Sequence, residues 1–72
     1  MNTRSTTRLV REGELVAEVL VSLVEVEGGW APYLSLEDAY KLDDVRDALR
    51  TGDTKRASQL AHRIYRLTPL EA

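Results

Sequence analysis

The most regular hydrophobic pattern of the chain lies in residues 15–26. From position 15 to position 23 every odd residue is apolar, whereas the even positions mix apolar residues with Glu18 and Ser22. This alternation is typical of a β-strand. A helix through the same residues would hold five valines, whose branched side chains are restricted against the preceding helical turn. We therefore predict a long strand over residues 15–26.

A second, shorter strand is predicted just before it. Residues 8–11 are followed by Glu12 and Gly13, and glycine can supply the positive φ that a tight hairpin turn requires. With these two residues as the turn, Arg11 lies opposite Glu14, so that opposite charges face each other across the hairpin.

Two helices are predicted in the second half of the chain. Ser35 can accept a hydrogen bond from a free amide of a first helical turn, and Glu37 and Asp38 place negative charge there. Gly52 ends this helix, and Asp53 can cap a second, shorter one. Apolar residues of the first helix recur every three or four positions: Leu36, Ala39, Tyr40, Leu42, Val45, Ala48 and Leu49.

The remaining segments complete the predicted fold. Residues 30–33 form a loop or a short edge segment, because Pro32 cannot donate to a β-ladder. Near the end, Ile64, Tyr65 and Leu67 suit a final strand, and Pro69 limits any helix. We predict an α+β fold in which two short helices cover an antiparallel hairpin sheet, in the order β-β-α-α-β. Residues 1–7 are expected to be a flexible N-terminal segment, and residues 8–72 a single small domain.

Length and composition restrict the class of protein. The chain has 72 residues, a formal net charge of -2, and no cysteine, which leaves no disulfide, zinc ribbon or thiol nucleophile. No apolar stretch is long enough for a signal peptide or a membrane span, because glutamates interrupt the most hydrophobic region. We therefore expect a soluble, cytoplasmic protein with no membrane partner.

The residues that could perform chemistry are few. His62 is the only histidine, and no cysteine accompanies it as a second zinc ligand. Asp43 and Asp47 are spaced to share one helical face, but such exposed carboxylates are usually solvated and Arg46 and Arg50 can offset their repulsion. We expect no catalytic residue, no bound metal and no cofactor, and hence no enzyme.

Charge is distributed unevenly along the chain. Residues 12–38 contain seven acidic residues and no lysine or arginine, whereas residues 50–66 contain five basic residues and one aspartate. A basic face on the second helix could meet nucleic-acid phosphates or an acidic protein, and it could equally be a solvated face. The candidate patch consists of Lys55, Arg56, Arg63 and Arg66.

The apolar residues of the long strand suggest a second surface. They occupy both faces of the strand, and one layer of helices can cover only one face. A second copy or a protein partner could cover the other face. The loop aromatics could anchor such a partner or could close the end of the core. The candidate partner-binding residues are Val16, Leu20, Val24, Trp30 and Tyr33.

Several segments together resemble a group of short bacterial proteins of unassigned function, and the resemblance covers most of the chain. In size and composition the chain is similar to small antitoxin-like partners. The segments are Gly13, Gly29-Trp30-Ala31-Pro32-Tyr33-Leu34-Ser35-Leu36-Glu37-Asp38-Ala39, Leu42-Asp43-Asp44-Val45-Arg46, Ala48-Leu49-Arg50, Gly52-Asp53 and Tyr65-Arg66-Leu67-Thr68-Pro69.

Two functions follow as hypotheses. The first is a non-enzymatic protein-interaction module that forms a homodimer or binds a protein partner, with an antitoxin-like inhibitor as one form. The alternative is a small nucleic-acid-binding protein that uses the basic second helix.

Overall fold

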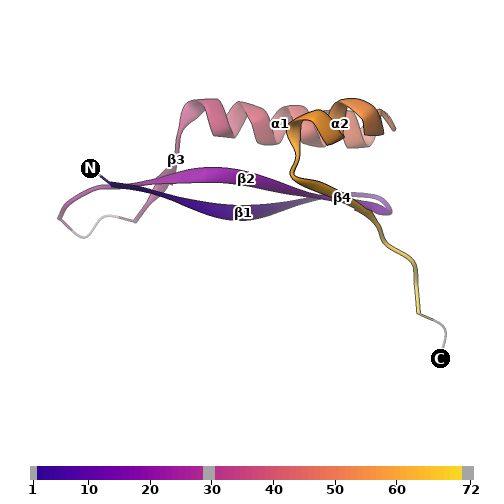
Figure 1. The fold of residues 1–72 in the computed structure, drawn as a ribbon, viewed down its shortest axis with the longest axis horizontal. Coiled ribbons are helices and arrows are strands. Elements are labelled where there is room, and N and C mark those ends of the chain that lie inside the picture. Colours follow the sequence, from indigo (N-terminus) through magenta and orange to yellow (C-terminus); the bar gives the residue numbers. More distant parts are fainter. Residues whose placement is uncertain (1, 29–30, 71–72) are drawn as a thin grey trace.

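The computed structural model describes residues 2–28 and 31–70, which form an antiparallel four-stranded sheet with two helices on one side (Figure 1). The α+β class is therefore confirmed. One strand is added to the predicted order, which becomes β-β-β-α-α-β. The elements are β1 (Asn2–Glu12), β2 (Leu15–Glu25), β3 (Tyr33–Leu34), α1 (Leu36–Arg50), α2 (Thr54–Leu60) and β4 (Arg63–Arg66).

β1 and β2 form one long hairpin. They pair along their full length, from Asn2 opposite Glu25 to Glu12 opposite Leu15. β1 thus begins at Asn2, whereas the sequence predicts a flexible segment over residues 1–7. The missed part is rich in threonine and serine and carries no apolar alternation. Threonine favours extended backbone, and an exposed edge strand requires no apolar face.

The hairpin turn differs from the predicted one by one residue. The two turn residues are Gly13 and Glu14, so that Val10 lies opposite Ala17. Gly13 has a φ of +60°, and no described residue other than glycine has a positive φ. Positive φ at the first turn position alone is the arrangement of a type II′ turn, which favours glycine there. The predicted turn put glycine second, and its pairing of Arg11 with Glu14 is wrong.

β2 is the central strand and pairs with all three others. Beyond β1, its C-terminal end pairs with β3, and its N-terminal end pairs with β4. The strand predicted around Ile64 is confirmed as β4, and β3 is the short edge segment that follows Pro32. Between these two partners, residues 19–22 of β2 have no strand on that side.

Side chains of α1 occupy this gap in the sheet. The backbone N–H of Ser22 donates to Asp38 Oδ2 at 2.6 Å, and Lys41 Nζ donates to the carbonyl oxygen of Leu20 at 2.7 Å. Asp38 and Lys41 also form an ion pair at 3.7 Å. These two side chains therefore take over hydrogen bonds that a neighbouring strand would otherwise supply.

Both helices begin at the predicted caps. Ser35 Oγ accepts a hydrogen bond from the N–H of Asp38 at 3.2 Å, and the Asp53 carboxylate accepts one from the N–H of Arg56 at 3.1 Å. Gly52 separates the helices with a φ of +78°, which few other residues adopt without strain. The caps and the glycine thus set where α1 ends and α2 begins.

The core lies between the helices and one face of the sheet. α1 packs on β1 and β2, and α2 packs against α1 and β4. The core is made largely of alanine and valine, and the principal-axis extents of the molecule are 47 × 31 × 15 Å. The buried hydrophobic residues among those described are Val10, Ala17, Val19, Val21, Val45, Ala48, Leu49 and Ala57.

Candidate functional site

The sheet surface opposite the helices is left uncovered by the described residues, as Figure 1 shows. Side chains alternate along a strand, and Ala17, Val19 and Val21 are buried under the helices. The even-numbered side chains of β2 therefore point to the opposite surface. The strand pairings place odd-numbered residues of β1, β3 and β4 beside them. We call this surface the open face; its apolar residues are Leu9, Val16, Leu20, Val24, Tyr33 and Tyr65.

The strand pairings place these apolar side chains near one another on the open face. Val24 lies opposite Tyr33, and Val16 lies opposite Tyr65. Leu9 is opposite Glu18 and thus diagonal to Val16 and Leu20, within reach of long side chains. Exposure is high for the large residues, at 67% for Leu9, 52% for Leu20, 51% for Tyr33 and 41% for Tyr65. Scattered exposed apolar residues are ordinary, but an aligned group on one sheet face marks an interaction surface.

The structure brings together four of the five predicted partner-binding residues. Val16, Leu20 and Val24 come from β2, and Tyr33 comes from β3. Trp30 lies outside the described residues. Sequence reasoning missed Leu9 and Tyr65. Leu9 could have been found from strand parity, because the predicted hairpin places it on the face of Val16, whereas the face of Tyr65 depends on the register of β4, which the sequence does not give.

Charged residues divide the apolar patch near its centre. Glu18 lies between the apolar residues of β2, and its Oε1 accepts a hydrogen bond from Tyr65 Oη at 2.8 Å. Arg63 is opposite Glu18 across the β2–β4 pair, and Arg11 is diagonal to it on β1. The open face thus carries charges of both signs.

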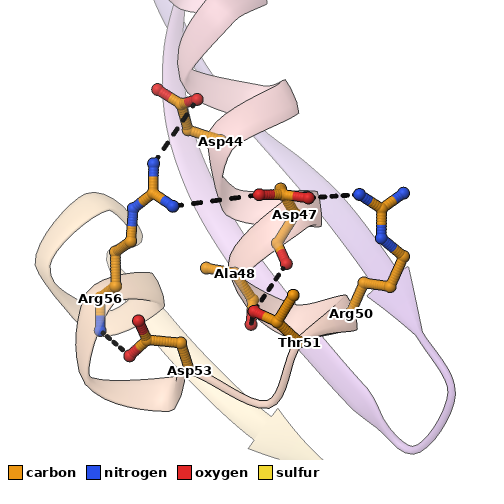
Figure 2. Close-up of polar contacts among 7 residues, drawn as sticks. All are labelled: Asp44, Asp47, Ala48, Arg50, Thr51, Asp53 and Arg56. Carbon is orange, nitrogen blue, oxygen red and sulfur yellow. Dashed lines mark hydrogen bonds and ion pairs between the residues drawn. The ribbon is translucent and has the colours of Figure 1, made fainter.

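The basic residues of the second half do not share one face. Arg63 lies on the open face, and Arg66 pairs with Glu14 at 3.6 Å near the hairpin turn. Figure 2 shows the Arg56 guanidinium against two carboxylates of α1, Asp44 at 3.8 Å and Asp47 at 4.0 Å. These ion pairs are exposed, and each stabilises the fold by about 0.2–1 kcal/mol.

The junction of α1 and α2 is held by a small polar network (Figure 2). Asp47 binds Arg56 with one carboxylate oxygen and Arg50 with the other. The Thr51 hydroxyl donates toward the last carbonyl oxygens of α1, at 3.1 Å from Asp47 O and 3.2 Å from Ala48 O. The Asp47 carboxylate therefore lies between the side chains of two arginines.

Lys55 and Arg66 both line an open hollow of about 410 Å³. Hydroxyl groups of α2 and β4 share its wall with apolar side chains. A cation pair with hydroxyl donors is suited to phosphate oxygens. The lining residues are Leu15, Thr54, Lys55, Ser58, Ile64, Tyr65 and Arg66.

The other candidates for chemistry are dispersed. His62 follows α2 with an exposed side chain, and its backbone N–H donates to Glu18 O at 2.7 Å. Asp43 lies on α1, beside a groove next to β1. Across residues 2–28 and 31–70, no group of three or more His, Asp or Glu is arranged to hold a metal ion.

No helix in the described part of the chain is both long and apolar enough to cross a membrane.

Comparisons with protein-family models, with curated proteins and with solved structures find no match to this chain.

Proposed function

We propose that this protein is a small, non-enzymatic interaction module that forms a homodimer through the open face. The observation that carries the proposal is the row of exposed apolar side chains on the sheet surface that no described element covers. The core beneath the helices consists largely of alanine and valine, and a domain of this size hides only about 60% of its unfolded surface. Burial of the open face would add apolar contacts that the single chain lacks.

The area of the open face suits a second copy. A strand of 11 residues is about 36 Å long, and three neighbouring strands are about 14 Å wide, so the face covers about 500 Å². Two such faces packed about 10 Å apart bury about 1,000 Å² in total. This area is at the lower limit for a specific protein–protein interface. A dimer of moderate affinity is therefore expected.

The charges of the open face also allow self-association. A two-fold dimer brings the same surface of each copy together. Each charged residue of the open face must therefore meet a residue of opposite charge on the open face of the other copy. Glu18 and the arginines at positions 11 and 63 meet this requirement. A face with charges of one sign only would repel its copy.

The test is a measurement of mass in solution. Wild-type protein, Leu20→Glu and Leu36→Glu are compared by sedimentation equilibrium over micromolar to millimolar concentrations. Leu36 is the matched control, because it is also an exposed leucine, at 68%, but it belongs to α1 and not to the open face. We expect dimers for wild type and Leu36→Glu, and monomers for Leu20→Glu because a carboxylate would be buried unpaired.

Two results would contradict the proposal. The first is a wild-type protein that stays monomeric at millimolar concentration. The second is a dimer that Leu20→Glu leaves intact, since that dimer would use another surface. Circular dichroism of each variant verifies that the substitutions leave the secondary structure unchanged.

A protein partner in place of the second copy is the other form of this proposal. An antitoxin-like inhibitor would cover a toxin surface with the same residues, and Tyr33 at the edge of the face supplies a rigid, half-exposed anchor. In that case Leu20→Glu abolishes binding to the purified partner, whereas Leu36→Glu does not.

Binding of nucleic acid is the alternative function. The observation in its favour is the hollow where Lys55 and Arg66 meet hydroxyl groups, and against it stand the carboxylates that pair with Arg56 and Arg66. Fluorescence anisotropy with single- and double-stranded DNA at low salt tests it. This function requires affinity that falls steeply with salt and is lost in Lys55→Glu/Arg56→Glu. No change in anisotropy at low salt rejects it.

A further inference from the structure

β1 forms the free edge of the sheet, and the hydrogen bonds of β2 reveal how that edge is oriented. Glu18 and Leu20 of β2 accept bonds through their carbonyl oxygens, and Ser22 donates through its N–H, all on the side away from β1. In an antiparallel pair both backbone groups of a residue point the same way, and successive residues alternate. Residues 19 and 21 therefore bond to β1.

The strand register then shows which residues of β1 bond to β2 and which face outward. Val19 lies opposite Arg8 and Val21 lies opposite Thr6, so the even-numbered residues of β1 bond to β2. The odd-numbered residues direct their N–H and C=O groups outward, where no described strand meets them. Between Thr3 and Arg11, five consecutive odd positions thus offer a row of free donors and acceptors.

A groove of about 420 Å³ runs along the same edge, between β1 and α1. Arg8, Leu9 and Val10 all line it, although Leu9 points to the open face and Val10 to the core. Three consecutive residues of β1, the edge strand, therefore line this groove. The apolar part of the lining comes from Val10, Leu34, Ala39 and Leu42.

The charges around the groove favour an acidic occupant. Arg8 of β1 and Arg46 of α1 stand at its rim with a single carboxylate, Asp43. Within the described residues, neither arginine forms an ion pair. A second copy of β1 is a poor occupant, because each strand carries three arginines and one glutamate. Self-pairing would thus bring like charges together.

We propose that the free edge of β1 binds an extended segment of another protein in which acidic and apolar residues alternate. The segment adds to the sheet as a fifth strand through the outward backbone groups of β1. Its acidic side chains lie on the helix side, near Arg8 and Arg46. Its apolar side chains lie on the other side and extend the open face from Leu9.

The probe is a fluorescein-labelled synthetic peptide of about nine alternating glutamate and valine residues, long enough to span one strand. A peptide with lysine in place of glutamate is the matched control. Binding to the full protein is measured by fluorescence anisotropy at low salt and again at higher salt. We expect the glutamate peptide to bind at least about tenfold more tightly than the lysine peptide, and the difference to shrink with salt.

Protein variants separate the backbone and the charge contributions. Thr7→Pro removes an outward N–H, which an edge strand tolerates because its ladder bonds are made by the flanking residues. We expect it to weaken peptide binding about tenfold, and Arg8→Glu/Arg46→Glu to weaken it by at least as much. Lys55→Glu, a charge reversal on α2, is the control and should change the affinity by less than about twofold.

A measurement on the wild-type protein makes the test independent of these variants. Addition of the strand protects the backbone amides of Ser5, Thr7 and Leu9 from hydrogen exchange, observed by NMR. Equal affinity for the two peptides, no detectable binding, or bound peptide without new protection of these amides would each overturn the proposal. If the wild-type protein self-associates and Thr7→Pro does not, the occupant of the β1 edge is a second copy of this chain instead.

Discussion

Replacement of Asp38 by alanine tests how the gap in β2 is held. Asp38 lies in the first turn of α1, and its carboxylate accepts the N–H of Ser22 at 2.6 Å with only 17% of the side chain exposed. Asp38→Ala leaves the Ser22 N–H without its partner in the middle of the central strand. It also removes the ion pair with Lys41.

The expected loss follows from these contacts. A hydrogen bond to a charged group contributes about 1.5–3 kcal/mol, and a carboxylate in the first helical turn adds about 0.3–1 kcal/mol. We therefore expect Asp38→Ala to lower the free energy of unfolding by about 2–4 kcal/mol. A domain of this length has a total stability of about 4–11 kcal/mol. The melting temperature should fall by about 10–20 °C.

The measurement is thermal and urea denaturation followed by far-UV circular dichroism. Glu37→Ala is the matched control, because Glu37 is the neighbouring first-turn carboxylate and is exposed. It shares the helix-end position with Asp38 but has no contact with β2, so its replacement should cost less than about 0.5 kcal/mol. Asp38→Asn keeps an acceptor oxygen without the charge and should fall between the two alanine variants.

Equal losses for Asp38→Ala and Glu37→Ala would refute this reasoning, because the effect would then belong to the helix end and not to the sheet. If Lys41→Met leaves the free energy of unfolding unchanged while Asp38→Ala lowers it, the stabilisation belongs to the Ser22 hydrogen bond alone. A double-mutant cycle of Asp38→Ala and Lys41→Met measures the ion pair directly: additive losses mean that the two side chains do not stabilise each other, and a smaller combined loss means that they do.

Three other substitutions have expected outcomes in the same denaturation assay. Gly52→Ala should cost about 1–2 kcal/mol, because alanine resists a φ of +78° although the space around it is open, and Gly52→Asn should cost less. Val19→Ala removes two methyl groups from a fully buried site and should cost about 2–3 kcal/mol, whereas Val26→Ala at an exposed site should be nearly neutral. Ser35→Ala removes the cap of α1 and should cost about 1 kcal/mol, and a variant as stable as wild type would show that this cap is dispensable.

Those parts of the fold that depend on local chemistry could be predicted from the sequence. The alternation in residues 15–23, the caps at Ser35 and Asp53, and the stop at Gly52 all act on neighbouring backbone groups, and each is present in the structure. The apolar residues on the second face of β2 also follow from alternation alone, because the side-chain period of a strand is two residues.

The parts that depend on distant contacts could not be predicted in the same way. β3 has only two residues, too few for a pattern, and it pairs because β2 offers a free edge there. Glu37 lies four residues before Lys41, a spacing that favours an ion pair on a helix, but Lys41 instead contacts Asp38 and the Leu20 carbonyl. The position of α1 over the sheet decides this partner. The basic residues predicted as one patch are separated for the same reason.

The dependence of the sheet on β2 has a consequence for biosynthesis. The hairpin is contiguous in sequence and can close within microseconds, whereas β4 lies more than forty residues after its pairing partner. A nascent chain therefore exposes the helix side of β2 as well as the open face until α1 and α2 have left the ribosome. During this interval the chain is most prone to aggregate, and the arginines along β1 then keep neighbouring chains apart.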